Sequence, residues 1–368
     1  MRSKKIKLLF VLGTRPEALK LAPVILKARS DKRFQPVVCL TAQHRQMVDQ
    51  VMHFFKIKPD YDLDLMQKDQ TLLSLTQRLL PEIQKVIHEV RPDLLLVQGD
   101  TTTAFGVALQ AFYEKVSVGH VEAGLRSFDK YQPFPEEINR VLISHLGDFH
   151  FAPTSEARHN LLKEGVQAAR VFVTGNTVVD ALQTTRHMLG SKSTQNKKKL
   201  VLVTAHRRES FGAPLREICK ALKDIVKLGP EIEIIYPVHL NPKVQKIVFQ
   251  ELRGQKQIKL IDPLSYPDFV RLMDQAYLIL TDSGGVQEEA PTFKKPVLVM
   301  REVTERPDGI TLGVARLVGT SRKKIYQEAK RLLTDPKAYR SMIKNKNPYG
   351  DGKASERILD IIARRFKK

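Results

Sequence analysis

Short apolar runs alternate along the chain with longer segments whose apolar positions repeat at helical spacing. In the first half, strand-like runs lie at residues 6–12, 37–40, 94–97, 116–118 and 149–151. Helix-like stretches between them include residues 17–29, 71–90 and 103–113. This alternation is typical of βαβ units, and it predicts a parallel sheet with helices on its faces.

A second series of strand-like runs follows a polar segment, residues 190–199, that has no apolar period. These runs lie at residues 200–204, 232–236, 258–261, 278–280 and 297–300.

The chain has 368 residues, which is too many for one compact core. We therefore expect an α/β protein of two doubly wound, Rossmann-like domains that face each other across a cleft. We place them at residues 1–177 and 178–354, with a C-terminal helix at about 355–368 that packs back on the first. In such sheets, ligands bind beyond the carboxyl ends of the strands.

Composition is that of an ordinary soluble globular enzyme, with 42% hydrophobic and 27% charged residues. No uninterrupted apolar run is long enough to span a bilayer. The first strand-like run contains Lys7 and is followed by polar residues, which favours a buried strand over a signal peptide. Cys39 and Cys219 are far apart and lack metal-ligand spacing, so we expect a reducing cytoplasm and no metal site.

The net charge of +21 is the unusual bulk property, and two interpretations compete for it. A nucleic-acid-binding module would gather Lys and Arg on one element with aromatic residues between them. Here the basic residues are scattered, apart from short clusters at residues 4–5, 197–199 and 364–368, and there is no Trp. We favour a generally basic surface around a site for an anionic small molecule, and we expect no nucleic-acid partner.

The segment LTDSGGVQEEAP places Ser283, Gly284 and Gly285 between an apolar run and a predicted helix. Backbone N–H groups and the helix dipole at such a turn can bind phosphate, and glycine lets the ligand approach. The alternative is an ordinary turn between a strand and a helix. Arg301 and Arg306 follow the next apolar run, which favours the anion site.

Polar residues also follow the strand-like runs of the first half. Arg15 comes after the first run, where it faces the cleft or solvent. Asp100 comes after the third run, where it is either a ligand-facing carboxylate or a helix N-cap. After the second run, Gln43, His44 and Gln46 either bind a ligand or cap a helix.

The densest polar segment is residues 118–140. In it, Glu122 lies just past an apolar run and before Gly124, which does not fit a solvated face. Glu136 and Arg140 are four residues apart on a predicted helix, so the simplest expectation is a stabilising surface pair.

In the second half, His206 and His239 each follow a strand-like run. A single histidine is usually structural, but two at successive strand ends beside arginines favour a binding role. The sequence has neither a Walker A loop nor a GxGxxG segment, so nothing indicates a tightly bound dinucleotide and we expect no cofactor.

Taken together, these motifs resemble one enzyme family. In chain order they are GTRPEALKLAP, TAQHRQM, QGDTTT, GHVEAGLR, PFPEEINR, FAPT, GNTVVD, TAHRRESFG, YPVHLNP, LTDSGGVQEEAP and TERPD. The chain is similar to the non-hydrolysing UDP-N-acetylglucosamine 2-epimerases from about residue 8 to about residue 320. The resemblance implies a glycosyltransferase-B-like fold, a homodimer, no nicotinamide, no membrane insertion, and interconversion of UDP-N-acetylglucosamine (UDP-GlcNAc) with UDP-N-acetylmannosamine (UDP-ManNAc).

The resemblance also implies roles for individual residues. Positions tied to catalysis are Asp100, Glu122, Glu136 and His206. Positions that bind the substrate, mainly its UDP portion, are Arg15, Lys20, His239, Ser283, Gly284, Gly285, Glu289 and Arg306. Gln43, His44 and Gln46 match an activator site that binds a second UDP-GlcNAc in bacterial members.

One segment, residues 312–317, departs from the family pattern, which leaves open whether the sugar is GlcNAc or a more decorated acetamido sugar. A nucleotide-sugar glycosyltransferase on the same fold and a hydrolysing epimerase are the remaining enzyme alternatives.

The implied reaction is elimination of UDP followed by its re-addition through a 2-acetamidoglucal intermediate. The C2 proton of a pyranose is not acidic, but departure of the anomeric diphosphate makes it removable. Cations and N–H groups then stabilise the leaving diphosphate, and carboxylates remove and return the proton. Asp100, Glu122 and Glu136 are the available carboxylates, and the sequence does not distinguish their roles.

Overall fold

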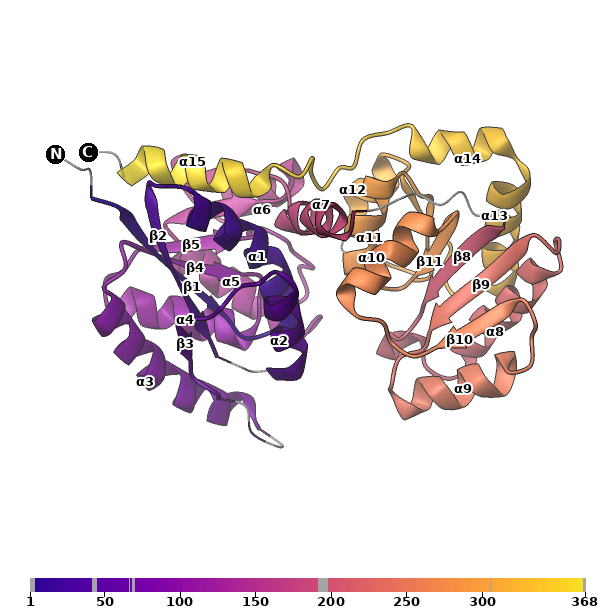
Figure 1. Ribbon diagram of the computed structural model, residues 1–368, viewed down its shortest axis with the longest axis horizontal. Coiled ribbons are helices and arrows are strands. Elements are labelled where there is room, and N and C mark those ends of the chain that lie inside the picture. Colours follow the sequence, from indigo (N-terminus) through magenta and orange to yellow (C-terminus); the bar gives the residue numbers. More distant parts are fainter. Residues whose placement is uncertain are drawn as a thin grey trace. The chain divides into compact units, whose positions relative to one another are not determined.

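The computed structural model describes residues 4–41, 45–65, 67, 70–190, 198–304 and 306–366. The chain divides into two compact units, each built on one parallel sheet (Figure 1). The first unit comprises Met1–Thr184 and Gly350–Lys368, and the second comprises Thr185–Tyr349.

The first unit contains a seven-stranded sheet in the order β3-β2-β1-β4-β5-β6-β7, and every neighbouring pair is parallel. The strands are β1 (Ile6–Leu12), β2 (Phe34–Leu40), β3 (Tyr61–Asp62), β4 (Leu94–Gln98), β5 (Val118–Val121), β6 (Phe149–Ala152) and β7 (Val171–Val173). The helices are α1 (Arg15–Ser30), α2 (Arg45–Phe54), α3 (Leu72–Val90), α4 (Thr102–Tyr113), α5 (Glu136–Leu146), α6 (Ser155–Lys163), α7 (Thr177–Leu189), which runs on into the second unit, and α15 (Ala354–Phe366). The central strand β4 is buried at every position, as expected for a sheet covered on both faces.

The second unit contains a six-stranded parallel sheet in the order β10-β9-β8-β11-β12-β13. The strands are β8 (Lys199–Thr204), β9 (Ile232–Pro237), β10 (Ile258–Ile261), β11 (Leu278–Thr281), β12 (Val297–Val299) and β13 (Ala315–Leu317). The helices are α8 (Ala213–Val226), α9 (Pro242–Leu252), α10 (Tyr266–Gln275), α11 (Gly284–Glu289), α12 (Pro307–Thr311), α13 (Arg322–Thr334) and α14 (Pro336–Ile343). In both units the first strand of the series lies inside the sheet, and the next two strands lie on one side of it. The predicted α/β class with parallel sheets is confirmed.

The apolar pattern was wrong about one strand and missed three short ones. The expected run at residues 116–118 is displaced, because the strand is β5, which continues through His120. His120 is fully buried, and its ring nitrogen is 2.7 Å from the carbonyl oxygen of Gly99, so a polar side chain is tolerated inside the strand. The missed strands, β3, β7 and β13, are all edge strands of two or three residues with exposed positions, so their apolar signal is weak.

Helix α15 belongs to the first unit, where it packs along α1 (Figure 1). The carboxylate of Asp180 accepts the backbone N–H groups of Ala354 at 3.2 Å and Ser355 at 2.8 Å. Lys27 of α1 also pairs with Glu356 at 2.9 Å. The first turn of α15 is therefore held by a buried side chain of α7.

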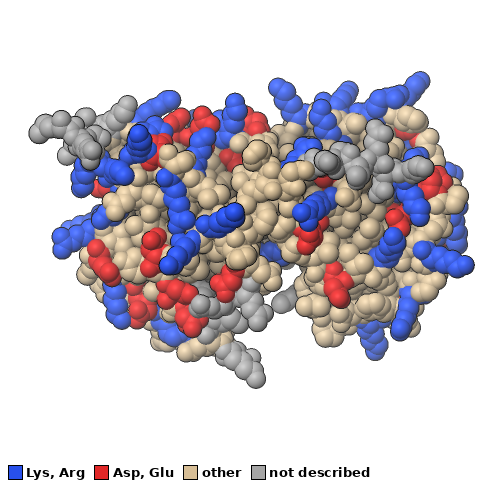
Figure 2. Space-filling model, in the orientation of Figure 1, with Lys and Arg blue, Asp and Glu red and all other residues tan. Residues whose placement is uncertain are grey.

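The basic residues do not gather on one element of the face shown in Figure 2, where Asp and Glu lie among Lys and Arg. Within the described part of the chain, no helix is both long and apolar enough to cross a membrane.

Candidate active site

Asp100 lies in the turn after β4, and a residue of α5 contacts its side chain. Gly99 has a φ of +71°, a conformation that favours glycine. The cap of α4 is Thr101, whose hydroxyl accepts the N–H of Ala104 at 2.9 Å, so the alternative of Asp100 as an N-cap is wrong. Instead, Asp100 forms an ion pair with Arg140 at 2.6 Å. Burial raises the pKa of Asp100, and Arg140 opposes that rise.

Arg140 does not form the expected surface pair with Glu136. It is only 7% exposed, and besides Asp100 it contacts Glu137 at 3.5 Å. The spacing of four residues does place both side chains on one helix face, but Arg140 is buried there and Glu136 is partly buried. One carboxylate oxygen of Glu136 is buried with no hydrogen-bond partner among the described residues. Glu122 and Glu136 both act electrostatically on Asp100, so these three carboxylates share one region of the first unit.

Glu122 directly follows β5 and has a φ of +66°, in the left-handed region. Its carboxylate forms an ion pair with Lys20 of α1 and accepts the side-chain amide of Asn176 at 2.8 Å. The side chains of Lys20 and Glu122 are about 10% and 8% exposed. A buried ion pair persists only when further hydrogen bonds satisfy its charges, and Asn176 supplies one of them.

Glu17 and Asn139 also shape this region, and sequence reasoning assigned neither to the site. Glu17 accepts the backbone N–H groups of Gly13 and Thr14, each at 2.7 Å, and the Thr101 hydroxyl at 2.5 Å. The amide of Asn139 donates to the carbonyl oxygen of Asp100 at 3.0 Å. The Thr-x-x-Glu spacing before α1 is a capping-box signal that could have identified Glu17.

Arg15 was expected at the end of the first strand. It is instead the first residue of α1, three positions after β1 ends, and it is half-buried. Gln43 and His44 of the expected activator site lie outside the described residues, and for Gln46 only its place in α2 is described.

In the second unit, His206 follows β8 and is fixed by Asp282, which follows β11. Asp282 is fully buried and accepts the backbone N–H groups of His206 at 2.6 Å and Arg207 at 2.8 Å. Its other oxygen is 3.5 Å from Nδ1 of His206. Burial lowers the pKa of His206, and the charge of Asp282 opposes this. Sequence reasoning gave Asp282 no role, although a carboxylate directly after a buried strand was a usable signal.

His239 stacks on His206, with ring centroids 5.2 Å apart and planes 12° from parallel. Its Nδ1 accepts the backbone N–H of Asn241 at 3.0 Å, so a neutral ring carries its proton on Nε2. The structure therefore brings the two predicted histidines of the second unit together.

The glycine turn after β11 is occupied by an arginine. A Cβ on Gly284 would lie 2.8 Å from Cζ of Arg306, so glycine is required for the guanidinium to approach. Arg306 donates from Nε to Glu288, a buried carboxylate, at 3.0 Å. Of the two predicted cations, Arg306 reaches the turn, whereas Nε of Arg301 donates to Glu209 at 2.7 Å.

Glu289 lies at the end of α11 and is buried. The Tyr266 hydroxyl donates to it at 3.1 Å. Ser283 precedes α11, and its backbone N–H donates to the Thr281 hydroxyl at 2.9 Å. Of the predicted substrate-binding residues of this segment, Gly284, Gly285 and Glu289 thus belong to one short helix, and Ser283 directly precedes it.

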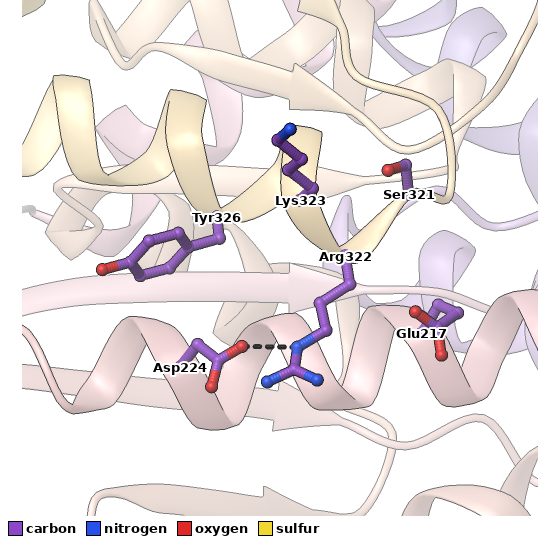
Figure 3. A pocket seen from close by; sticks show the side chains of 6 residues that line it. All are labelled: Glu217, Asp224, Ser321, Arg322, Lys323 and Tyr326. Atoms are coloured by element: carbon purple, nitrogen blue, oxygen red, sulfur yellow. Dashed lines mark hydrogen bonds and ion pairs between the residues drawn. The ribbon is translucent and has the colours of Figure 1, made fainter.

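A separate surface hollow lies between α8 and α13 and contains none of the predicted site residues (Figure 3). In it, Arg322 donates to Asp224 at 2.6 Å, while Lys323 points away from that pair. Five of the predicted site residues lie instead within two positions of the carboxyl end of a strand: Asp100, Glu122, His206, His239 and Ser283.

Comparison with known proteins gives consistent matches over nearly the whole chain. The family model described as UDP-N-acetylglucosamine 2-epimerase matches residues 26–363. The UDP-N-acetylglucosamine 2-epimerase of Escherichia coli O157:H7 is 51% identical over 97% of this chain and 98% of its own length.

Solved structures agree with the sequence matches. The UDP-GlcNAc 2-epimerase of Neisseria meningitidis, bound to UDP-GlcNAc, has a TM-score of 0.91 and 43% identity, covering 98% of this chain and all of its own. A Staphylococcus aureus protein in complex with UDP has a TM-score of 0.89 and 45% identity, covering 97% and 96%. These neighbours establish the glycosyltransferase-B-like fold. With the family's motifs placed at the strand ends of both sheets, the chain belongs to the UDP-N-acetylglucosamine 2-epimerase family.

Proposed function

We propose that the protein interconverts UDP-GlcNAc and UDP-ManNAc by eliminating UDP and adding it back through 2-acetamidoglucal. Relatives solved with UDP-GlcNAc or UDP support the substrate class. The observation that carries the chemistry is the set of three carboxylates, Asp100, Glu122 and Glu136, that share one region of the first unit. Two cations, Lys20 and Arg140, are paired with them.

The reaction needs both a base and an acid. Elimination removes the C2 proton and breaks the bond between C1 and the diphosphate oxygen, so a C1–C2 double bond forms and UDP leaves as an anion. Addition reverses these steps, and the proton is delivered to the opposite face of C2. Positioned carboxylates perform both transfers. The raised pKa of Asp100 suits a group that carries a proton during part of the cycle.

We assign diphosphate binding to the glycine turn and Arg306 of the second unit. Because Gly284 has no Cβ, the guanidinium and the backbone converge at one point. Arginine pairs strongly with phosphate, and a fixed cation stabilises charge as the diphosphate leaves. We assign His206, held by Asp282, to the same leaving group.

The direct test is to incubate the pure protein with UDP-GlcNAc, without added nicotinamide, and to separate the sugar nucleotides by chromatography. The expected result is UDP-ManNAc at a constant ratio to UDP-GlcNAc, with little free UDP. Free UDP as the main product would indicate a hydrolysing enzyme. The absence of both products contradicts the proposal.

We also propose a homodimer that buries one face of α3, α4 and α5, helices that neighbour one another in the first unit. They expose the large apolar residues Leu72, Leu73, Phe112, Tyr113, Ile138 and Leu142. Exposed apolar residues on neighbouring helices mark interaction sites. Sedimentation should give twice the chain mass of 41.9 kDa, and Phe112→Glu should give the monomer. A monomeric wild-type protein contradicts this proposal.

We propose that the enzyme acts in the cytoplasm. Cys39 and Cys219 are both free and buried. Burial raises the pKa of each thiol to about 12, so neither is a reactive thiolate at neutral pH. Unpaired thiols fit a reducing compartment, and cell fractionation tests the assignment.

A further inference from the structure

The motif GNTVVD, residues 175–180, connects β7 to α7 and has no role in the reaction described so far. Gly175 takes a φ of +88°, which turns the chain after β7. Asn176 follows it and is only 2% exposed. A buried amide must be hydrogen-bonded, so its partners define its role.

The orientation of the Asn176 amide is fixed by its own backbone. Its Oδ1 accepts the N–H of Val178 at 3.0 Å. Because the amide oxygen only accepts and the amide nitrogen only donates, Nδ2 must donate at the opposite side. There it meets the carboxylate of Glu122 at 2.8 Å.

The donor from Asn176 reaches the same oxygen, Oε2 of Glu122, that pairs with Lys20. One oxygen thus faces an ammonium and an amide N–H, both of which stabilise the ionised form of a carboxylate. Asp100 is close enough to interact electrostatically with Glu122, and a negative charge on either carboxylate disfavours ionisation of the other. The two donors on Glu122 therefore favour its ionised form, whereas burial favours the protonated form of the neighbouring Asp100.

The backbone of Asn176 packs against the segment that begins at Gly350, where the chain returns to the first unit. A Cβ on Gly350 would lie 3.4 Å from the backbone nitrogen of Asn176, so the two segments pack closely. Four residues after Asn176, Asp180 binds the first turn of α15. The motif is thus closely packed at one end and hydrogen-bonded at the other, which restricts the position of the Asn176 side chain.

We propose that Asn176 is a positioning residue of the epimerase, whose amide holds the carboxylate of Glu122 in place and in its ionised form. Asn176 acts through Glu122 and not on the sugar. The inference rests on the proposed function and deepens it, because it names the group that prepares one of the acting carboxylates.

The test compares Asn176→Ala with Asn176→Asp, and Gln257→Ala is the control. Gln257 is a half-buried amide of the second unit that donates to the carbonyl oxygens of Val226, Gly229 and Ile232. Misplacement of an acting group costs about 10²-fold, so kcat should fall by about that factor in Asn176→Ala. UDP affinity and KM should change little. Gln257→Ala should lower stability and leave kcat intact.

Asn176→Asp separates positioning from packing. Aspartate keeps an acceptor for the N–H of Val178, so a merely structural role predicts a milder loss than in Asn176→Ala. Our proposal predicts the reverse order, because a second carboxylate replaces the donor beside Glu122. Equal or milder loss in Asn176→Asp, or a loss confined to KM, overturns the proposal.

A second readout does not depend on turnover. Carbon-13 NMR can follow the Glu122 carboxyl group through a pH titration, with Glu122→Gln to assign its signal. Lys20 and Asp100 face this group and are unchanged in Asn176→Asp. The midpoint should therefore move to higher pH in Asn176→Asp, and an unmoved midpoint contradicts the inference. Failure of wild-type protein to convert UDP-GlcNAc would contradict the proposed function instead.

Discussion

The first six strands of each unit follow the same order, but the two units use ionisable groups in opposite ways. In the first unit, carboxylates are the groups we assign to chemistry, and cations support them. Arg140 pairs with Asp100 at 2.6 Å, and Lys20 pairs with Glu122. Two of the three acids, Asp100 and Glu122, are thus each held by a buried cation.

In the second unit, the supporting groups are the acids. Asp282 orders the loop that carries His206, and Glu288 binds Arg306 at 3.0 Å. Both carboxylates are almost fully buried. The same topology therefore presents acids at one sheet and bases at the other, which shows that the residues at strand ends, and not the fold, determine the chemistry.

The largest effect on this contrast between the units is expected from Glu122→Gln in the first unit, which should lower kcat. Loss of a positioned acid or base lowers kcat by about 10²- to 10⁴-fold. Affinity for UDP, measured by calorimetry, should stay at the wild-type value because the substitution leaves the second unit unchanged. Glu82→Gln, at an exposed carboxylate, is the control. Full turnover in Glu122→Gln would remove the role given to this residue.

The counterpart in the second unit is Gly284→Val. Its side chain would occupy the space of the Arg306 guanidinium, so the cation must move from the turn. A hydrogen bond to a charged group contributes about 1.5–3 kcal/mol, so UDP affinity should fall about 10- to 100-fold. Gly285→Ala should cost less, because its Cβ would come no closer than 4.0 Å to Ser283. Circular dichroism checks the fold, and unchanged affinity in a folded Gly284→Val contradicts the assignment.

Acid should destabilise the first unit through two histidines that lie side by side on β5 and β6. Burial lowers the pKa of His120 to about 3 and that of His150 to about 4, from an ordinary 6.5. Their contribution is therefore present above pH 6.5 and is lost as the pH falls toward those values. Each should cost about 1.4 kcal/mol of unfolding free energy per pH unit.

Urea denaturation between pH 7 and pH 5 measures that slope. The raised pKa of Asp100 acts in the opposite direction, so the comparison must be made with a variant. His150→Gln should remove about half of the histidine contribution. An unchanged slope in this variant would show that His150 does not bind its proton on unfolding.

The smallest expected effect is the loss of stability when the contacts that hold α15 on the first unit are removed. Asp180→Ala removes the side chain that caps α15, which should cost about 1–2 kcal/mol of unfolding free energy. Lys27→Met removes an ion pair with Glu356 in which both side chains are about half exposed, so it should cost less than about 1 kcal/mol. Denaturant titration measures the unfolding free energy of both variants. Equal losses would contradict the claim that the buried Asp180 stabilises α15 more than the exposed ion pair does.

The elements that sequence predicted well include those with long apolar runs, such as β1 and β8. Short edge strands and β5 were missed or displaced because their few apolar positions are interrupted. The polar motifs identified the strand ends at which the candidate residues lie, but not their partners. Spacing alone placed Arg140 on the same face as Glu136, yet could not show that this face is buried against Asp100.

The partners of Asp282 and Asn176 were missed for a related reason. Each acts through a contact with a residue more than fifty positions away in the chain, and such contacts leave no local pattern. Only the folded sheet order brings them to the groups they hold.

The most direct test of elimination and re-addition is the reaction of UDP-GlcNAc with wild-type protein in heavy water, without added NAD. A carboxylate that removes the C2 proton exchanges it with solvent before addition. Mass spectrometry and proton NMR of the UDP-ManNAc formed should therefore show one deuterium at C2. Product that retains hydrogen at C2, or turnover that requires added NAD, would contradict the mechanism.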